Sequence, residues 1–139
     1  RRFEFKGKYN GADVYDDYAH HPDELKATID AVRASMPGRR LILAFQPHTY
    51  TRTKALFEDF VRELRKSDVL ILAEIYAARE SNTVGISSAD LAEQIPGSVF
   101  CETLPEVTSR LKEVVREGDV VITMGAGDIF RAGEALLSG

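Results

Sequence analysis

The segment DDYAHHPDE, residues 16–24, places two carboxylates, a phenol and two imidazoles within six positions. Such side chains can bind a metal ion, transfer protons, hold a polar ligand or start a helix. His20 and His21 are candidates for a general base, because imidazole exchanges protons near neutral pH. Adjacent histidines point in different directions, and the segment lacks cysteine and the helical HExxH spacing. We therefore predict no metal site held by this domain.

Two interpretations of this segment stay open. The residues act together on a ligand, or they have structural roles, with His21 capping a helix and Asp17 accepting bonds from backbone amides. Their grouping favours ligand binding.

A second polar segment is QPHTYTRT, residues 46–53. Pro47 ends the preceding apolar run, because proline cannot continue a central strand. His48 and Arg52, at the start of a predicted helix, can bind a carboxylate or phosphate. The guanidinium offers two parallel donors, and amides at the helix start would add more. The alternative is that Arg52 is a solvated helix residue and that Tyr50 serves packing.

Two weaker segments follow later in the chain. GAGD, residues 125–128, resembles a turn between a strand and a helix over which a ligand could pass. It is neither a GxxxxGK[ST] loop nor a dinucleotide motif, since Phe130 stands where the third glycine would be. In the segment 74–80, Tyr76, Arg79 and Glu80 either lie beside the other segments or pair with each other at the surface.

Alternating strands and helices must position these residues. The continuous apolar runs at 41–45, 69–73 and 120–123 predict strands buried on both faces, and weaker strands are expected at 12–15 and 99–101. Apolar stripes and start signals predict five helices. The first starts at His21-Pro22 and buries Leu25, Ile29, Val32 and Met36, and the second has Thr51 or Thr53 as N-cap and buries Phe57, Phe60, Val61 and Leu64. A short third helix has Ser87 or Ser88 as N-cap, the fourth buries Val107, Leu111, Val114 and Val115, and the fifth covers residues 129–137.

This alternation predicts a doubly wound α/β fold, Rossmann-like, with a mainly parallel sheet and helices on both faces. Ligands of such sheets bind beyond the carboxyl ends of the strands. All four polar segments follow a predicted strand, and the three histidines of the chain lie in the first two. The sequence therefore predicts one binding edge.

Composition narrows the class of protein. A chain of 139 residues with 44% hydrophobic residues is expected to form a single domain over residues 1–139. A net charge of −4 argues against nucleic acid as a partner, and the apolar runs are too short to span a membrane. The single cysteine, Cys101, suits a reducing, cytoplasmic setting. Residues 1–11 carry no predicted element and are open to interpretation as the end of a linker.

The chain resembles the C-terminal domain of the Mur ligases over essentially its whole length. The resemblance rests on five segments in order: RRFE at 1–4, DDYAHHPDE at 16–24, FQPHTYTRT at 45–53, EIYAARE at 74–80 and MGAGDI at 124–129. Within the family, the QPH and HHP elements are similar to those of members that join L-alanine to UDP-N-acetylmuramate.

The resemblance implies ATP-dependent amide synthesis through an acyl phosphate, in the assembly of peptidoglycan precursors. The chain would be the third domain of a three-domain enzyme and would work with its own N-terminal and central domains. Mg²⁺ would be held mainly by the central domain, and the fragment alone would be inactive. The implied ligands of ATP are Arg2, Asp17, Tyr18 and His21, and those of the amino-acid carboxylate are His48 and Arg52.

Relatives with an extra arginine at the position of Thr49 would share the carboxylate between two guanidinium groups, so this chain would depend more on Arg52. Two alternatives remain. One is a Mur-type ligase for another amino acid or peptide. The other is an independent α/β module that binds nucleotides or acidic metabolites.

Overall fold

A computed structural model describes residues 2–139; Arg1, the first residue of the RRFE segment, lies outside the described residues. The fold is built on one six-stranded sheet with the order β1-β2-β6-β3-β4-β5. Strands β2 to β6 run parallel and β1 pairs antiparallel with β2, which confirms the predicted doubly wound, mainly parallel sheet. The strands are β1 Glu4–Tyr9, β2 Ala12–Asp17, β3 Leu41–Phe45, β4 Val69–Ala73, β5 Val99–Cys101 and β6 Val120–Met124.

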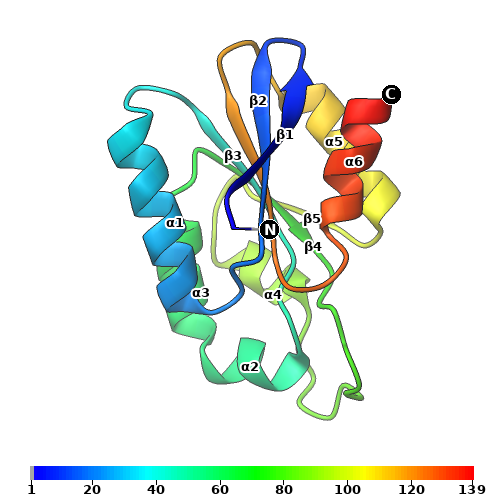
Figure 1. Cartoon of the computed structure of the whole chain (residues 1–139). Helices are drawn as coiled ribbons and strands as arrows, with labels where there is room; N and C mark the ends of the chain where they lie inside the picture. The colour runs from blue at the N-terminus through cyan, green and yellow to red at the C-terminus, as the bar shows by residue number, and fades with distance from the viewer. Residues whose placement is uncertain (1) are drawn as a thin grey trace.

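Helices cover both faces of the sheet (Figure 1). Helices α1, α3 and α4 pack on one face, and α5 and α6 pack on the other. The short helix α2 lies at the end of the sheet where β3 ends (Figure 1). Among residues 2–139, no helix is both long and apolar enough to cross a membrane. The helices are α1 Pro22–Ser35, α2 Tyr50–Ala55, α3 Phe57–Leu64, α4 Ser88–Glu93, α5 Leu104–Val114 and α6 Phe130–Ser138.

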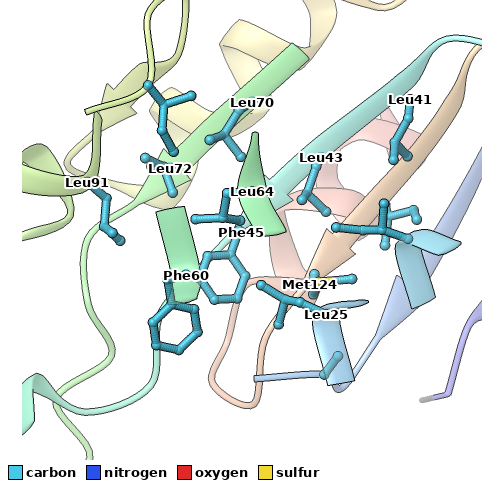
Figure 2. Packing of buried hydrophobic residues seen from close by; sticks show 14 of the residues in the cluster. Leu25, Leu41, Leu43, Phe45, Phe60, Leu64, Leu70, Leu72, Leu91 and Met124 are labelled. Carbon is cyan, nitrogen blue, oxygen red and sulfur yellow. The ribbon is translucent and has the colours of Figure 1, made fainter. Parts of the chain in front are cut away.

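The central strand β3 is buried along its whole length, as its apolar run predicts. Alternate side chains enter opposite cores, because successive residues of a strand point to opposite faces. Phe45 packs with Phe60 and Leu64 in the first core (Figure 2), whereas Ile42 belongs to the second core with Leu111. One hydrophobic core therefore packs on each face of the sheet, and together they fix the positions of the strand ends.

Two helix starts follow the sequence signals. His21 is the N-cap of α1, with Pro22 in the first turn and Glu24 closing a capping box. Ser87 caps α4 in the same way with Asp90.

The start of the next helical stretch was predicted wrongly. Helix α2 begins at Tyr50, so Thr51 and Thr53 lie inside it and Thr49 occupies the N-cap position. Leu56 separates α2 from α3, and the apolar stripe belongs to α3 alone. The hydroxyls act elsewhere: that of Thr53 donates to the carbonyl of Thr49, and that of Thr51 donates to Glu80.

Residues 4–9 form the edge strand β1 of the sheet rather than the end of a linker. Strand β1 turns into β2 at Asn10 and Gly11, whose φ angles are 47° and 84°. Asn-Gly favours this turn because both residues tolerate positive φ. The sequence thus contains the turn signal. It does not show the alternation of apolar and polar residues that would mark the strand, because β1 pairs irregularly near Gly7 and is largely exposed.

Candidate functional site

Four rings from three strand ends form a continuous row at the carboxyl edge of the sheet. Tyr18 and His20 follow β2, His48 follows β3 and Tyr76 follows β4. Successive ring centroids are 5.4 Å apart for Tyr18–His20, 5.7 Å for His20–His48 and 5.6 Å for His48–Tyr76. We call these four residues the ring row. It brings together residues from the first three of the four polar segments, in chain order, that sequence analysis placed at one edge.

His20 has its protonation pattern fixed by the backbone. Its Nδ1 lies 3.1 Å from the carbonyl oxygen of Tyr18. A carbonyl only accepts, so Nδ1 carries the hydrogen, and the neutral ring has its lone pair on Nε2. His20 is therefore equipped to accept a proton at Nε2.

His48 and Arg52 form the cationic part of the site. Nη1 of Arg52 lies 3.4 Å from Nδ1 of His48. Because a guanidinium only donates, Nδ1 accepts and Nε2 carries the hydrogen. Burial, followed by the nearby charges of His20 and Arg52, holds the pKa of His48 below its ordinary value. The pair thus presents a neutral N–H donor beside a permanent cation, an arrangement suited to a carboxylate.

The backbone around His48 is fixed by the segment that follows β4. The amide of Thr49 donates to the carbonyl of Tyr76 over 2.9 Å, and the amide of Tyr76 donates to the carbonyl of Pro47 over 2.8 Å. Thr49 has a φ of 69°, an unfavourable conformation for a branched residue. Such strain persists where surrounding contacts over-determine it and is common at functional sites.

Glu80 caps α2 from outside the helix. Its carboxylate accepts from the amides of Tyr50 and Thr51 over 2.7 and 3.1 Å, and from the hydroxyl of Thr51. The hydroxyl bond, then the amide bonds, lowers the pKa of Glu80. The expectation that amides at this helix start bind a ligand is therefore wrong, since Glu80 occupies them. Arg79, the suggested partner of Glu80, is exposed.

The glycine turn after β6 is packed against the protein's own side chains. Gln46 donates to the carboxylate of Asp128 over 2.8 Å and accepts from the amides of Asp128 and Ile129. A Cβ at Gly127 would lie 2.6 Å from both Oε1 of Gln46 and Cγ of Tyr76. The turn is thus filled by these two residues rather than left open for a passing ligand. Sequence analysis missed Gln46, although its place directly after β3 marked it.

Asp17 is buried, with 2% of its surface exposed. One carboxylate oxygen accepts from the amide of Ala19 and the other from the hydroxyl of Thr28, each over 2.8 Å. These bonds hold the loop after β2 against α1, as the structural interpretation expected. Asp17 also lines a hollow of about 190 Å³ together with Arg2, Phe3 and Thr28.

The other predicted nucleotide ligands surround the start of α1. Arg2 reaches Glu24 with a 3.9 Å ion pair and keeps 77% of its side chain exposed. His21 is exposed, and its Nδ1 accepts from the amide of Asp23 over 3.4 Å. Burial raises the pKa of Glu24, but amide bonds from His20 and His21 outweigh it and leave a net lowering. The start of α1 is therefore a polar surface next to the hollow, whereas Tyr18 belongs to the ring row.

A ligand set for Mg²⁺ does not form in this part of the protein. Within residues 2–139, no three His, Cys, Asp or Glu side chains gather as a metal-binding group. The donors at the edge, the guanidinium of Arg52 and the imidazole of His48, suit anions rather than a hard cation.

The profile of the family described as "Mur ligase, glutamate ligase domain" matches residues 1–127. The chain belongs to the Mur ligase family. It is 50% identical over 141 residues to a UDP-N-acetylmuramate–L-alanine ligase of Lachnospira eligens, and the match covers 99% of this chain and 30% of that relative. The chain thus spans about three tenths of the length of such relatives.

Solved structures agree on the fold. A UDP-N-acetylmuramate–alanine ligase of Thermotoga maritima matches with a TM-score of 0.78 and 26% identity, over 99% of this chain and 29% of that one. At 16% identity and a TM-score of 0.68, a folylpolyglutamate synthase/dihydrofolate synthase of Yersinia pestis, in complex with AMPPNP and Mn, matches 99% of this chain and 30% of that one. The second likeness concerns the fold alone.

Proposed function

We propose that residues 1–139 are the C-terminal domain of an ATP-dependent ligase that joins L-alanine to UDP-N-acetylmuramate. The observation that carries this proposal is the His48–Arg52 pair, whose two donors lie at the carboxyl edge of the sheet. The 50% identity to a relative of that name supports the choice of amino acid.

The pair would bind the carboxylate of alanine. Alanine has little apolar surface, so its charged groups must supply most of the binding free energy. Arg52 donates from its guanidinium and His48 from Nε2, and each charge-assisted bond contributes about 1.5–3 kcal/mol. The lowered pKa of His48 keeps this donor neutral, which avoids the cost of placing two cations side by side without a ligand.

ATP would lie across the start of α1. Arg2 offers an exposed guanidinium to the phosphates, and Asp17 lines a hollow in which the ribose would bind. Tyr18 and His21 lie on the loop between β2 and α1, and both are exposed. The central domain would supply the ligands of Mg²⁺, and the metal would neutralise phosphate charge. The reducing cytoplasm suits the free, buried thiol of Cys101.

The chemistry would proceed in two steps. The lactoyl carboxylate of UDP-N-acetylmuramate takes the γ-phosphoryl group of ATP, which releases ADP and forms an acyl phosphate. The alanine amine then attacks the acyl carbon, an amide bond forms, and phosphate leaves. The ammonium group of alanine must lose a proton before attack, and His20 is the candidate acceptor at Nε2.

The test is the activity of the full-length enzyme with ATP and UDP-N-acetylmuramate. We expect turnover with L-alanine to exceed that with glycine, L-serine and a tripeptide. A preference for the tripeptide would indicate a different Mur-type ligase. Tight binding of ATP to the 139-residue chain alone, measured by calorimetry, would instead indicate an independent nucleotide-binding module.

A further inference from the structure

The segment 74–87, between β4 and α4, is fastened to the carboxylate site; we call it the strap. Its two ends are tied together, because Glu74 accepts from the amide of Ser88 over 2.9 Å and from the hydroxyl of Ser87 over 2.8 Å. Farther along, the carbonyl of Val84 accepts from Nζ of Lys54 over 2.8 Å. The strap is therefore a closed loop that also contacts α2.

Glu80 is the attachment of the strap nearest to the site. Its carboxylate holds the amides of Tyr50 and Thr51, the first two residues of α2. Arg52 follows directly and projects from the same first turn. Thr49, before the helix, has a positive φ. The first turn of a six-residue helix has little stability of its own, so its position depends on such outside bonds.

We propose that Glu80 is a positioning residue for the His48–Arg52 pair. Glu80 bonds to the backbone that carries Arg52 and to the hydroxyl beside it. Tyr76, on the same strap, stacks on His48. One segment thus fixes both donors, the imidazole through a ring and the guanidinium through the helix start. This inference rests on the proposed function for its ligand, the alanine carboxylate.

Occupying the helix start has a second effect. Free amides at the beginning of a helix attract carboxylates. If they were open, an amino-acid carboxylate could bind them instead of Arg52 and leave the amine in the wrong place. Because Glu80 already fills these two amides, they are not free to bind the carboxylate in place of Arg52.

The experiment compares Glu80→Ala and Glu80→Gln in the full-length enzyme. We expect Glu80→Ala to raise the KM for alanine about tenfold, because small misplacements of binding groups are costly, and to leave the KM for ATP unchanged. Glu80→Gln retains an acceptor oxygen for the amides and should restore part of the loss. Glu58→Ala, an exposed glutamate on α3, is the matched control and should match the parent enzyme.

Hydrogen exchange at the amides of Tyr50 and Thr51 gives a readout independent of turnover. Exchange should accelerate in Glu80→Ala and less in Glu80→Gln. Faster exchange with an unchanged alanine KM would overturn the positioning role, as would a rise in the KM for ATP equal to that for alanine. A parent enzyme that does not use alanine at all would refute the proposed function instead, whatever the exchange rates show.

Discussion

The imidazole of His48 stacks on the phenol ring of Tyr76, with centroids 5.6 Å apart and planes 21° apart. Gly127 also lies against the phenol, since a Cβ there would lie 2.6 Å from Cγ of Tyr76. The imidazole, the phenol and the turn after β6 therefore form one packed stack. We therefore expect a change in the turn to displace Tyr76 and, through it, His48.

Gly127→Ala tests this packing. The added methyl group would overlap Tyr76 and Gln46, and we expect a loss of about 1–3 kcal/mol in the free energy of unfolding, typical of overpacking. Chemical denaturation measures this loss, and NMR shifts of the His48 ring report its displacement. Gly38→Ala is the control: it has a φ of 80° and nothing within 4 Å, so only strain of about 1 kcal/mol is expected. An unmoved His48 signal in Gly127→Ala would contradict the stack.

Arg52→Ala should weaken alanine binding. Loss of one charge-assisted hydrogen bond of about 1.5–3 kcal/mol corresponds to a rise of roughly tenfold to 150-fold in the KM for alanine. The KM for ATP should stay the same, because the proposed nucleotide ligands lie around α1. Steady-state kinetics of the full-length enzyme measure both constants, with the exposed Arg131→Ala of α6 as control. An unaltered alanine KM would remove Arg52 from the carboxylate site.

The pKa of His48 should respond to its neighbours. Burial, His20 and Arg52 lower it, and Glu80 opposes them. Arg52→Gln removes a positive charge, so the pKa of His48 should rise, and NMR titration of the ring hydrogens measures it. Arg131→Gln, at an exposed position on α6, should leave it unchanged. A fall in the pKa on Arg52→Gln would contradict the assigned electrostatics.

The lowered pKa of His48 also sets the sign of a pH effect on stability. The ordinary pKa of His48 is 6.5, and its pKa in the folded protein is lower. As the pH falls, the unfolded chain therefore takes up a proton at His48 at a higher pH than the folded protein does. The contribution of His48 to stability is therefore present above pH 6.5 and is lost as the pH falls through the folded pKa. His48→Gln should flatten this part of a plot of unfolding free energy against pH. An unchanged slope between the two proteins would show that His48 does not titrate in this way.

At the opposite edge of the sheet, Arg40 pairs with Asp119 through two bonds of 3.0 and 2.8 Å. The Asp119 side chain is only 5% exposed. Arg40→Met leaves this carboxylate buried without its cation, which should cost about 3 kcal/mol of unfolding free energy. Urea denaturation checks the value. Arg116→Met, at an exposed position nearby, should change stability by less than about 0.5 kcal/mol. Equal changes in unfolding free energy for the two variants would show that the Arg40–Asp119 pair does not stabilise the fold.

The fold followed from features that are local in sequence. Apolar runs such as 41–45 predicted fully buried strands, and His21-Pro22 predicted the start of α1. Strand β1 escaped prediction because its exposed face and the bulge near Gly7 break the alternation of apolar and polar residues. The break at Leu56 escaped as well, since a helical stripe does not show where the backbone turns between two helices.

The sequence predicted that the site lies at the carboxyl edge of the sheet. It did not predict the contacts within the site. The position of each segment after a strand sufficed to bring His20 near His48. Glu80 capping α2 and Gln46 bonding to Asp128 join residues 29 to 82 positions apart. Such bonds depend on the relative heights of loops above the sheet, which no periodic pattern encodes.

Strand β6 is the last strand along the chain, yet it lies in the middle of the sheet, between β2 and β3. During synthesis β2 and β3 leave the ribosome long before the strand that joins them, so the nascent chain carries two separate fragments of sheet with open inner edges. Neither fragment can close until β6 is inserted. The domain is therefore obliged to fold late in translation, and a product terminated before residue 120 would lack the joining strand and be exposed to aggregation.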